Sequence, residues 1–532
     1  MLLCRRKKMG QGVVVIKTYG RTVIYANFTE KELLTGTKEE IISKVKNILE
    51  NAIPLHEKNK AETKYLWDYY SGIQDIYTEK QKLTRTEIDH KVVENWAYAF
   101  VDFKKTFLLG KPIQYVQSDS SASEEISVLN DYVKYENKKS KDLDIYEDIL
   151  VNGNGYRYTN TDKPNDDDEA PFEIINCDPA LTEVVYSSKL GNEQLLSFIE
   201  TSMKFIVTTV DPVTGAKEYQ PRYYSEYTVY LRNMKLVFTD KTGNLQVDDT
   251  KTELIAINEH IISEYYVNRK RISLIELGKD LFNSINNIES LDLDDMDAYV
   301  NNLLVFINCE ATEEDLKGMA ELGAVNITST DQKKASIETI QQRLQADGTQ
   351  IHYNRLLTAL HQILGIPMAS DNGTLESGDT GKAKLTGQGY TSATIRIEGD
   401  ETKFGDCDKQ CLKVILKICK SSPDSEIKEL KLIDVEPKFQ RDVSDNLLVK
   451  TQGLMNLLEA KIPKKYALEI PNLFSDVEAV VKDMEEEEKA NQELFNKNMQ
   501  QGFNQNKTNP EDIANNQNNE IKKLEETENQ EQ

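Results

Sequence analysis

Apolar residues spaced three or four apart predict long helices over much of the chain. A first helical region covers about 38–110, and one apolar face within it is marked by Val92, Val93, Trp96, Phe100, Phe103 and Phe107. Gly110 and Pro112 are expected to end that helix. Two shorter helices are expected near 122–137 and 141–151.

The pattern changes at about 153–260, where short β-type runs alternate with turn signals. The runs are GYRYTN, FEII, LTEVVY, YTVYL and KLVF, and the turns include Asp211-Pro212 and Thr242-Gly243. The acidic stretch at 165–169 is expected to form an exposed loop. A mostly β region set into a helical chain predicts an α+β fold.

Two more long helical patterns flank a small strand–helix–strand unit. The first covers about 272–304 and the second about 335–364. At ~1.5 Å per residue, the first helix would be about 45 Å long. Between the two patterns we expect, in order, a strand at 303–307, a helix from the N-cap Thr312 to Gly323, and a strand at 324–327.

The C-terminal part combines helices with a polar loop and a polar tail. The loop covers 366–381, and the helix after it, at about 382–420, is expected to bend or break at its glycines, which are Gly387, Gly389, Gly399 and Gly405. A last helical region covers 425–483. From Met484 the chain is rich in Glu, Asn and Gln, so we expect it to be helical at first and then disordered.

Charge and composition narrow the possible functions. The net charge is −24, from 65 basic and 89 acidic residues, which argues against a broad basic face that grips nucleic acid. A channel that surrounds DNA without holding it is compatible with this charge, and so is a charge that only maintains solubility. The six cysteines do not make a disulfide scaffold in a chain of 532 residues.

The N-terminal segment carries no recognisable targeting signal. MLLCRRKKMGQG has basic residues but no apolar core after them, and Met9 is as good a start as Met1. No apolar run approaches the ~20 residues that span a bilayer. We therefore expect a soluble, intracellular protein with no membrane partner.

Candidate chemistry is weak throughout. Gly373 and Gly378 have the glycine spacing of a phosphate-binding loop, but Asp379 stands where the lysine is needed and Lys382 is followed by Ala383. Two further groups could suggest a metal site. The first is Cys407, Cys411 and Cys419, for which thiols on one helix are the favoured interpretation. The second is Asp292, Asp294, Asp295 and Asp297, for which a solvated helix face is favoured. We expect no catalytic site, no cofactor and no metal.

Several stretches resemble a known family when taken in order. They are WDYYSGIQ at 67–74, NWAYAFVDFKKTFLLGKPI at 95–113, ILVNGNGY at 149–156, SGDTGKAKLTGQGY at 377–390, and the segments 435–441 and 471–478. Together with the element order, they resemble portal proteins of tailed double-stranded-DNA phages, in the family common in phages of Gram-positive hosts. The resemblance covers roughly 40–485. The first ~35 residues have no counterpart in it.

The resemblance implies a portal fold with a mixed α/β wing, two long stem helices, a small strand–helix–strand clip and a helical crown. The implied segments are 1–37, an arm of unclear role; 38–269, the wing; 270–303, stem helix 1; 304–335, the clip; 336–365, stem helix 2; 366–381, the tunnel loop; 382–424, a kinked helix of wing and channel; 425–483, the crown; and 484–532, an acidic tail.

The resemblance also implies sites and partners. The DNA-facing residues of the tunnel loop would be Ser370, Asp371, Asn372, Gly373, Thr374, Glu376, Ser377, Asp379 and Lys382. The clip residues facing the packaging motor or connector would be Glu313, Glu314, Asp315, Lys317 and Glu321. Partners would be other copies of the chain in a ring of twelve, major capsid and scaffold proteins, the large terminase subunit, head-completion or adaptor proteins, and double-stranded DNA without sequence specificity.

The implied protein is not an enzyme. It would sit at the portal vertex of the virion, and in the host cytoplasm during assembly, as a conduit for genome packaging and ejection. Two alternatives are a packaging ATPase subunit and an internal scaffold protein. The missing loop lysine argues against the first, and the β-rich region at 153–260 argues against the second.

Overall fold

The computed structural model of the chain describes most of its residues. The described ranges are 7–9, 12–14, 19–81, 86–117, 124–160, 170–210, 217–240, 243–300, 303–307, 336–340, 346–368, 390–440, 447–469 and 477–505. The chain divides into two compact units, which are described separately. The larger contains Met1–Tyr115 and Glu124–Val443, and the smaller contains Val116–Ser123 and Ser444–Gln532.

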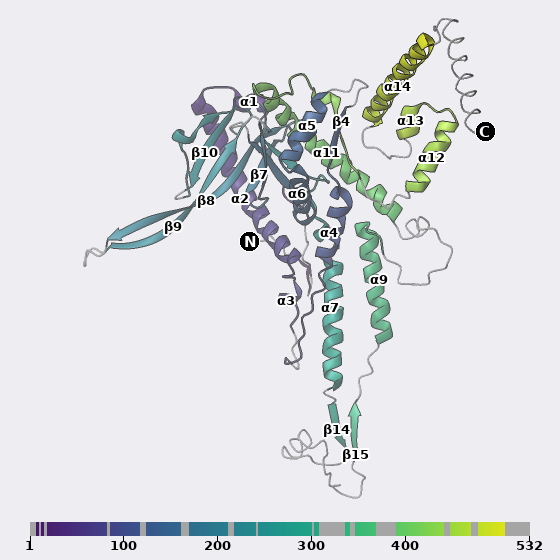
Figure 1. Cartoon of the computed structure of the whole chain (residues 1–532). Coiled ribbons are helices and arrows are strands. Elements are labelled where there is room, and N and C mark those ends of the chain that lie inside the picture. The colour runs from purple at the N-terminus through teal and green to yellow at the C-terminus, as the bar shows by residue number, and fades with distance from the viewer. Residues whose placement is uncertain are drawn as a thin grey trace, which may run out of the picture. The chain divides into compact units, whose positions relative to one another are not determined.

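Helices dominate the first part of the larger unit (Figure 1). They are α1 (Glu30–Leu34), α2 (Lys38–Tyr70), α3 (Ile76–Glu79), α4 (Trp96–Leu109), α5 (Glu124–Tyr135) and α6 (Lys138–Asn152). Capping boxes begin the first two: Thr29 pairs with Glu32 and Thr37 with Glu40. The helices expected near 122–137 and 141–151 are confirmed as α5 and α6.

The start of the predicted apolar helix face is wrong. Helix α4 begins at Trp96, and the Asn95 side chain accepts a hydrogen bond from the Tyr98 N–H at 3.3 Å. Val92 and Val93 precede the helix. The reason is that the backbone before Asn95 finds hydrogen-bond partners on another helix, as described below. The predicted end is confirmed, because Gly110 is the C-cap.

Two sheets form the β-rich region. The larger has the order β11-β10-β9-β8-β7-β3, with β12 also paired to β10; its strands are β3 (Ile24–Ala26), β7 (Thr182–Ser187), β8 (Gln194–Val210), β9 (Lys217–Tyr230), β10 (Met234–Asp240), β11 (Leu245–Val247) and β12 (Glu253–Leu254). Only the β3–β7 pairing in this sheet is parallel. The smaller has the order β13-β5-β6, made of β13 (Ile262–Tyr265), β5 (Gly155–Asn160) and β6 (Glu173–Cys177). The mixed α/β architecture predicted from the sequence is therefore present.

Helix α2 packs its apolar face on the larger sheet. Val45 and Leu49 of the helix are fully buried with Phe198 of β8 and Val229 of β9. A second core joins α4, α6 and the smaller sheet to the helices that follow. Gly153 lies between α6 and β5 in this second core. It ends α6 at φ +100°, and a Cβ there would lie 2.0 Å from the Arg271 carbonyl oxygen, so only glycine fits.

A long helix, two short strands and a second helix follow in order: α7 (Leu274–Val300), β14 (Leu303–Ile307), β15 (Ser336–Ile340) and α9 (Ala346–Leu364). Figure 1 shows α7 and α9 side by side with the strands at one end. The two strands pair antiparallel, from Leu303 opposite Ile340 to Ile307 opposite Ser336. The second helix was predicted to begin near 335, which is wrong: residues 336–340 form a strand that pairs along its whole length with β14. The predicted helix from Thr312 and the strand at 324–327 lie outside the described residues.

The last helix of the larger unit, α11 (Tyr390–Ser421), is continuous through Gly399 and Gly405. The break predicted at these two glycines is therefore wrong. Gly405 has a packing role instead, since Pro437 and Phe439 come within 3.5 and 3.6 Å of where its Cβ would be.

The region expected to be helical at 425–483 is only partly so. Its first part has a 3-10 turn at Leu432–Asp434 and strand β16 (Val435–Lys438), where Pro437 disfavours a helix because it lacks a backbone N–H. The smaller unit then contains α12 (Leu447–Glu459), α13 (Lys464–Glu469) and α14 (Val477–Gln505). Three short strands remain: β1 (Lys7–Met9) and β2 (Gly12–Val14) form a separate antiparallel pair, and β4 covers Gln114–Gln117.

Candidate functional site

The α7–α9 pair is joined to the body of the protein through α4. Leu360 of α9 is fully buried, and a Cβ on Gly278 of α7 would lie 3.3 Å from it, so the two helices approach closely at this level. The ring of His361 packs edge-on against Phe100 of α4, with ring centroids 4.9 Å apart. Tyr353 of α9 donates a hydrogen bond to a carboxylate oxygen of Glu94 at 2.8 Å. These contacts position both helices before they reach strands β14 and β15.

A non-helical segment, residues 88–95, runs antiparallel along one face of α7. Alternate backbone N–H groups of this segment donate to side chains four residues apart on the helix: His90 to Asp294 Oδ1 at 2.8 Å, Val92 to Ser290 Oγ at 2.9 Å, and Glu94 to Asn286 Oδ1 at 2.9 Å. The spacings agree, because two extended residues span about 6.6 Å and four helical residues about 6.0 Å. The segment is thus held along α7 by helix side chains rather than by a neighbouring strand.

Asp294 is the most connected residue of this contact. Its side chain is 1% exposed, and it accepts hydrogen bonds from the His90 N–H and from Lys80 Nζ, each at 2.8 Å. Lys80 also contacts Asp89 at 3.4 Å. The interpretation of the acidic cluster as a solvated face is therefore wrong for Asp294, although Asp295 and Asp297 are exposed.

Neither candidate metal group is assembled in the described part of the chain. No set of three or more histidine, cysteine, aspartate or glutamate side chains there is arranged to hold a metal ion. Cys407, Cys411 and Cys419 are buried free thiols on α11, as the sequence interpretation expected. Burial raises the pKa of each of these thiols.

Helix α11 is fixed to the core by a buried group of charges. Asp408 of α11 lies 3.1 Å from Lys138 of α6 and 3.6 Å from Arg157 of β5, and Asp142 bridges the two cations at 2.8 Å from each. The hydroxyls of Tyr115 and Tyr265 donate to the two oxygens of Asp408 at 2.6 and 2.9 Å. Burial alone would raise the pKa of Asp408, but the two neighbouring cations outweigh it and the pKa falls below its usual range.

The two helices that flank the predicted tunnel loop are held together at its base. Gly365, at φ +69°, follows the last residue of α9, which is a common way for a helix to end. Arg396 of α11 donates to the Ile363 carbonyl oxygen of α9 at 3.0 Å. The end of α9 and the first turns of α11 are thereby adjacent. The predicted DNA-facing residues, 370–382, lie outside the described residues, and so do the predicted motor-facing residues, 313–321.

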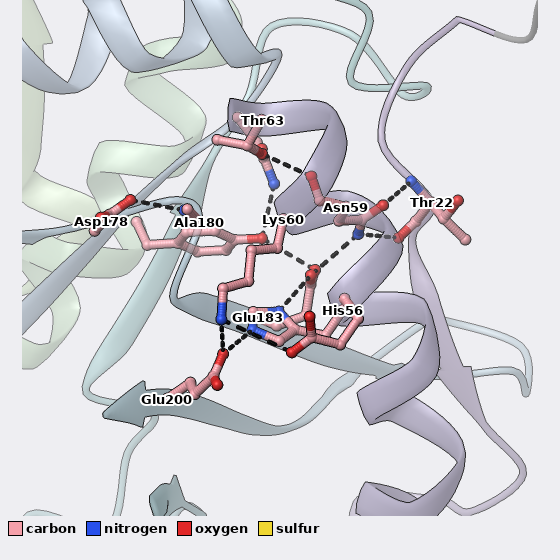
Figure 2. A network of polar contacts seen from close by, with 12 residues as sticks. Thr22, His56, Asn59, Lys60, Thr63, Asp178, Ala180, Glu183 and Glu200 are labelled. Atoms are coloured by element: carbon pink, nitrogen blue, oxygen red, sulfur yellow. Dashed lines mark hydrogen bonds and ion pairs between the residues drawn. The ribbon is translucent and has the colours of Figure 1, made fainter. Parts of the chain in front are cut away.

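A further polar network joins α2 to the larger sheet (Figure 2). His56 is buried between two carboxylates: Nε2 lies 3.3 Å from Glu200 of β8, and Nδ1 lies 3.6 Å from Glu183 of β7. Lys60 lies 2.5 Å from the same oxygen of Glu200. Burial lowers the pKa of His56, but the two carboxylates raise it more, to about 9; the pKa of Glu200 falls to about 2, mainly through its hydrogen bond with His56. Asn59 extends the network to the N-terminal segment through the backbone of Thr22.

No α-helix in the described part of the chain is both long and apolar enough to cross a membrane. A comparison of the sequence with curated proteins gave no match. Residues 49–494 match the family model described as "Phage portal protein, SPP1 Gp6-like", which covers most of the 532 residues and includes α4, the α7–α9 pair and α11. The chain therefore belongs to the SPP1 Gp6-like family of phage portal proteins.

Proposed function

We propose that residues 270–303 and 336–365 are the stem of the portal, residues 304–335 its clip, and residues 366–381 its tunnel loop. As a phage portal protein, the chain forms the ring-shaped channel at one capsid vertex through which the genome is packaged and ejected. Portal proteins are structural components of the capsid and form homo-oligomeric rings. The proposal assigns parts of this chain to parts of that machine.

The observation that carries the proposal is the α7–α9 pair. Two helices packed side by side lead into the antiparallel strands β14 and β15, and the chain between those strands, at 308–335, contains the predicted motor-facing residues. Such an element suits a narrow projection through the capsid opening. In the proposal, Glu313, Glu314, Asp315, Lys317 and Glu321 of the clip contact the large terminase subunit and later the head-completion proteins, since charges on a projecting element set partner choice.

The remaining segments take roles around this projection. Residues 38–269 would be the wing inside the capsid wall, α11 would brace the channel wall, and residues 425–483 would be the crown. Its ring would contain twelve subunits with a combined charge of twelve times −24, or −288. A channel of that charge repels phosphate and lets DNA slide.

The tunnel loop is proposed to centre the moving DNA. Helix–helix connections are usually ~2–8 residues, whereas α9 ends at Leu364 and α11 begins at Tyr390. Arg396 holds those two helix ends together, so a long loop is not needed to span a distance. Asp371, Glu376 and Asp379 would repel the phosphate backbone, and the hydroxyl and amide side chains between them would make transient contacts.

The test replaces Asp371, Glu376 and Asp379 with lysine and measures nuclease-protected DNA in an in vitro packaging reaction. A matched control replaces Asp166, Asp167 and Asp168 with lysine, which makes the same change of charge in the acidic stretch 165–169. Rings should form normally in both variants. Packaging by the tunnel-loop variant should slow or stall, most strongly at low salt, because the new lysine–phosphate contacts are screened as salt rises. Normal packaging at every salt concentration would show that the loop does not face the DNA.

A further inference from the structure

Strands β8 and β9 extend well beyond the sheet to which they belong (Figure 1). Their inner parts have sheet neighbours, because β7 pairs with β8 up to Ile199 and β10 pairs with β9 from Ser225. The outer parts, Thr201–Val210 and Lys217–Tyr224, pair only with each other among the described strands. At ~3.3 Å per residue, this two-stranded arm is about 30 Å long from Thr201 to Val210.

The root of the arm is fixed on both strands. Glu200, the last β8 residue before the arm, accepts hydrogen bonds from Lys60 at 2.5 Å and from Ser225 of β9 at 2.7 Å. The carboxylate of Glu226, next along β9, pairs with Lys251 at 2.6 Å. Figure 2 shows Glu200 facing His56 and Lys60 of α2. These contacts therefore hold the first residues of both strands at the base of the arm.

The arm exposes large apolar side chains on one face. Ile206 is 65% exposed and Tyr223 is 66% exposed. They share a face, because Tyr223 is the register partner of Lys204, which lies two residues from Ile206. A two-stranded hairpin with no covering layer is marginally stable in water, and both of its edges offer unpaired backbone groups. The arm thus has the features of a surface that another molecule covers.

The charge of the arm differs in sign from that of the rest of the chain. Residues 203–224 contain three basic and two acidic residues, for a net charge of +1, which leaves −25 on the remainder of a chain whose total is −24. A second copy of the same chain has a net charge of the opposite sign. Two arms meeting each other would gain no such complementarity.

We propose that the β8–β9 arm lies on the body of the neighbouring subunit in the ring and covers Ile206 and Tyr223 there. The proposal rests on the portal ring, which places a second copy beside every subunit. The arm would then act as a lateral clasp that adds intersubunit contact outside the stem.

The test compares ring stability in full-length variants by mass photometry over a dilution series. Ile206→Asp with Tyr223→Asp removes the apolar contact and reverses the charge of the arm. Leu254→Asp is the matched control, since Leu254 is 82% exposed on β12 of the same sheet. We expect the arm variant to dissociate at a concentration at least about tenfold higher than the wild type and the control, which corresponds to one lost contact of ordinary strength. Circular dichroism and thermal unfolding check that the subunit remains folded.

A second variant keeps the proposal testable if the first misfolds. Replacing 203–224 by Asn-Gly joins Ser202 to Ser225, which are register partners, through a two-residue turn. Its rings should be weakened in the same way. Rings as stable as those of the wild type in both variants would overturn the proposal. If the variants formed stable rings but were not incorporated into capsid shells, the arm would contact the capsid instead of the neighbouring subunit. If the wild type itself formed no rings, the portal assignment on which the proposal rests would fail first.

Discussion

Asp294→Ala tests whether segment 88–95 is held along α7 as described. The substitution removes both acceptors at once: Oδ1 for the His90 N–H and Oδ2 for Lys80, each at 2.8 Å. Breaking a buried ion pair costs ~3–5 kcal/mol. In the variant, Lys80 still has two partners, Asp89 at 3.4 Å and the His90 carbonyl oxygen at 2.6 Å. The lost stabilisation of the segment should therefore be near the lower limit, about 3 kcal/mol.

The consequence should be local, because the rest of α7 has its own core contacts. A loss of about 3 kcal/mol in the closed state of the segment corresponds to a ~100-fold faster hydrogen exchange. The assay is hydrogen–deuterium exchange with mass spectrometry on the assembled protein, following peptides that contain His90, Val92 and Glu94. The increase should be confined to these peptides and to α7 beside them.

Asp295→Ala is the matched control, with the same residue type on the next position of the same helix. Asp295 is exposed. The pKa of Asp292 is raised mainly by burial and to a smaller extent by the charge of Asp295. Its removal should leave exchange in segment 88–95 unchanged. Equal exchange rates in the Asp294 variant and the wild type would show that segment 88–95 does not depend on this acceptor.

The charges and the composition of the chain also affect its stability, its binding to the motor and its assembly. The free energy of unfolding should fall by up to about 3 kcal/mol between pH 6.5 and 9, because the pKa of His56 is about 9 in the folded state and 6.5 in the unfolded state, so its contribution to stability is lost as pH rises. Urea titrations of the His56→Gln variant should lack this fall. An identical fall in the variant would exclude His56 as its source. Glu313→Lys with Glu314→Lys should leave rings intact but weaken terminase capture in a pull-down, and undiminished capture would place the motor contact elsewhere. A chain ending at Gln505 should form rings as the full chain does in light scattering, because residues 506–532 contain few apolar side chains; a monomeric product would make the tail part of the interface.

Local patterns predicted most elements of the fold. The apolar periodicity of 274–291 gave α7, and the alternation and turn signals of 153–260 gave the strands. The errors arose where a tertiary partner decided the conformation. Val92 fits a helical apolar face by spacing, but its N–H bonds to Ser290, which is 198 residues away in sequence. In the sequence, Ser336–Ile340 continues a helical pattern, but in the structure it pairs with β14 as a strand.

The polar contacts of the site were largely invisible in the sequence. Lys138 and Asp142 have the spacing of an exposed helix ion pair, yet both are buried because Asp408 and Arg157 come from distant elements. No local signal marks such a group. The i, i+4, i+8 series Asn286, Ser290 and Asp294 was a usable clue, since three short polar residues on one helix stripe suggest a shared partner.

The portal assignment is tested most directly by electron microscopy of the purified full-length chain, with class averages and a count of the subunits. A portal protein should form closed rings with a central hole, and we expect twelvefold symmetry in the averages. Monomers, dimers or open filaments at all concentrations, with no closed ring, would contradict it.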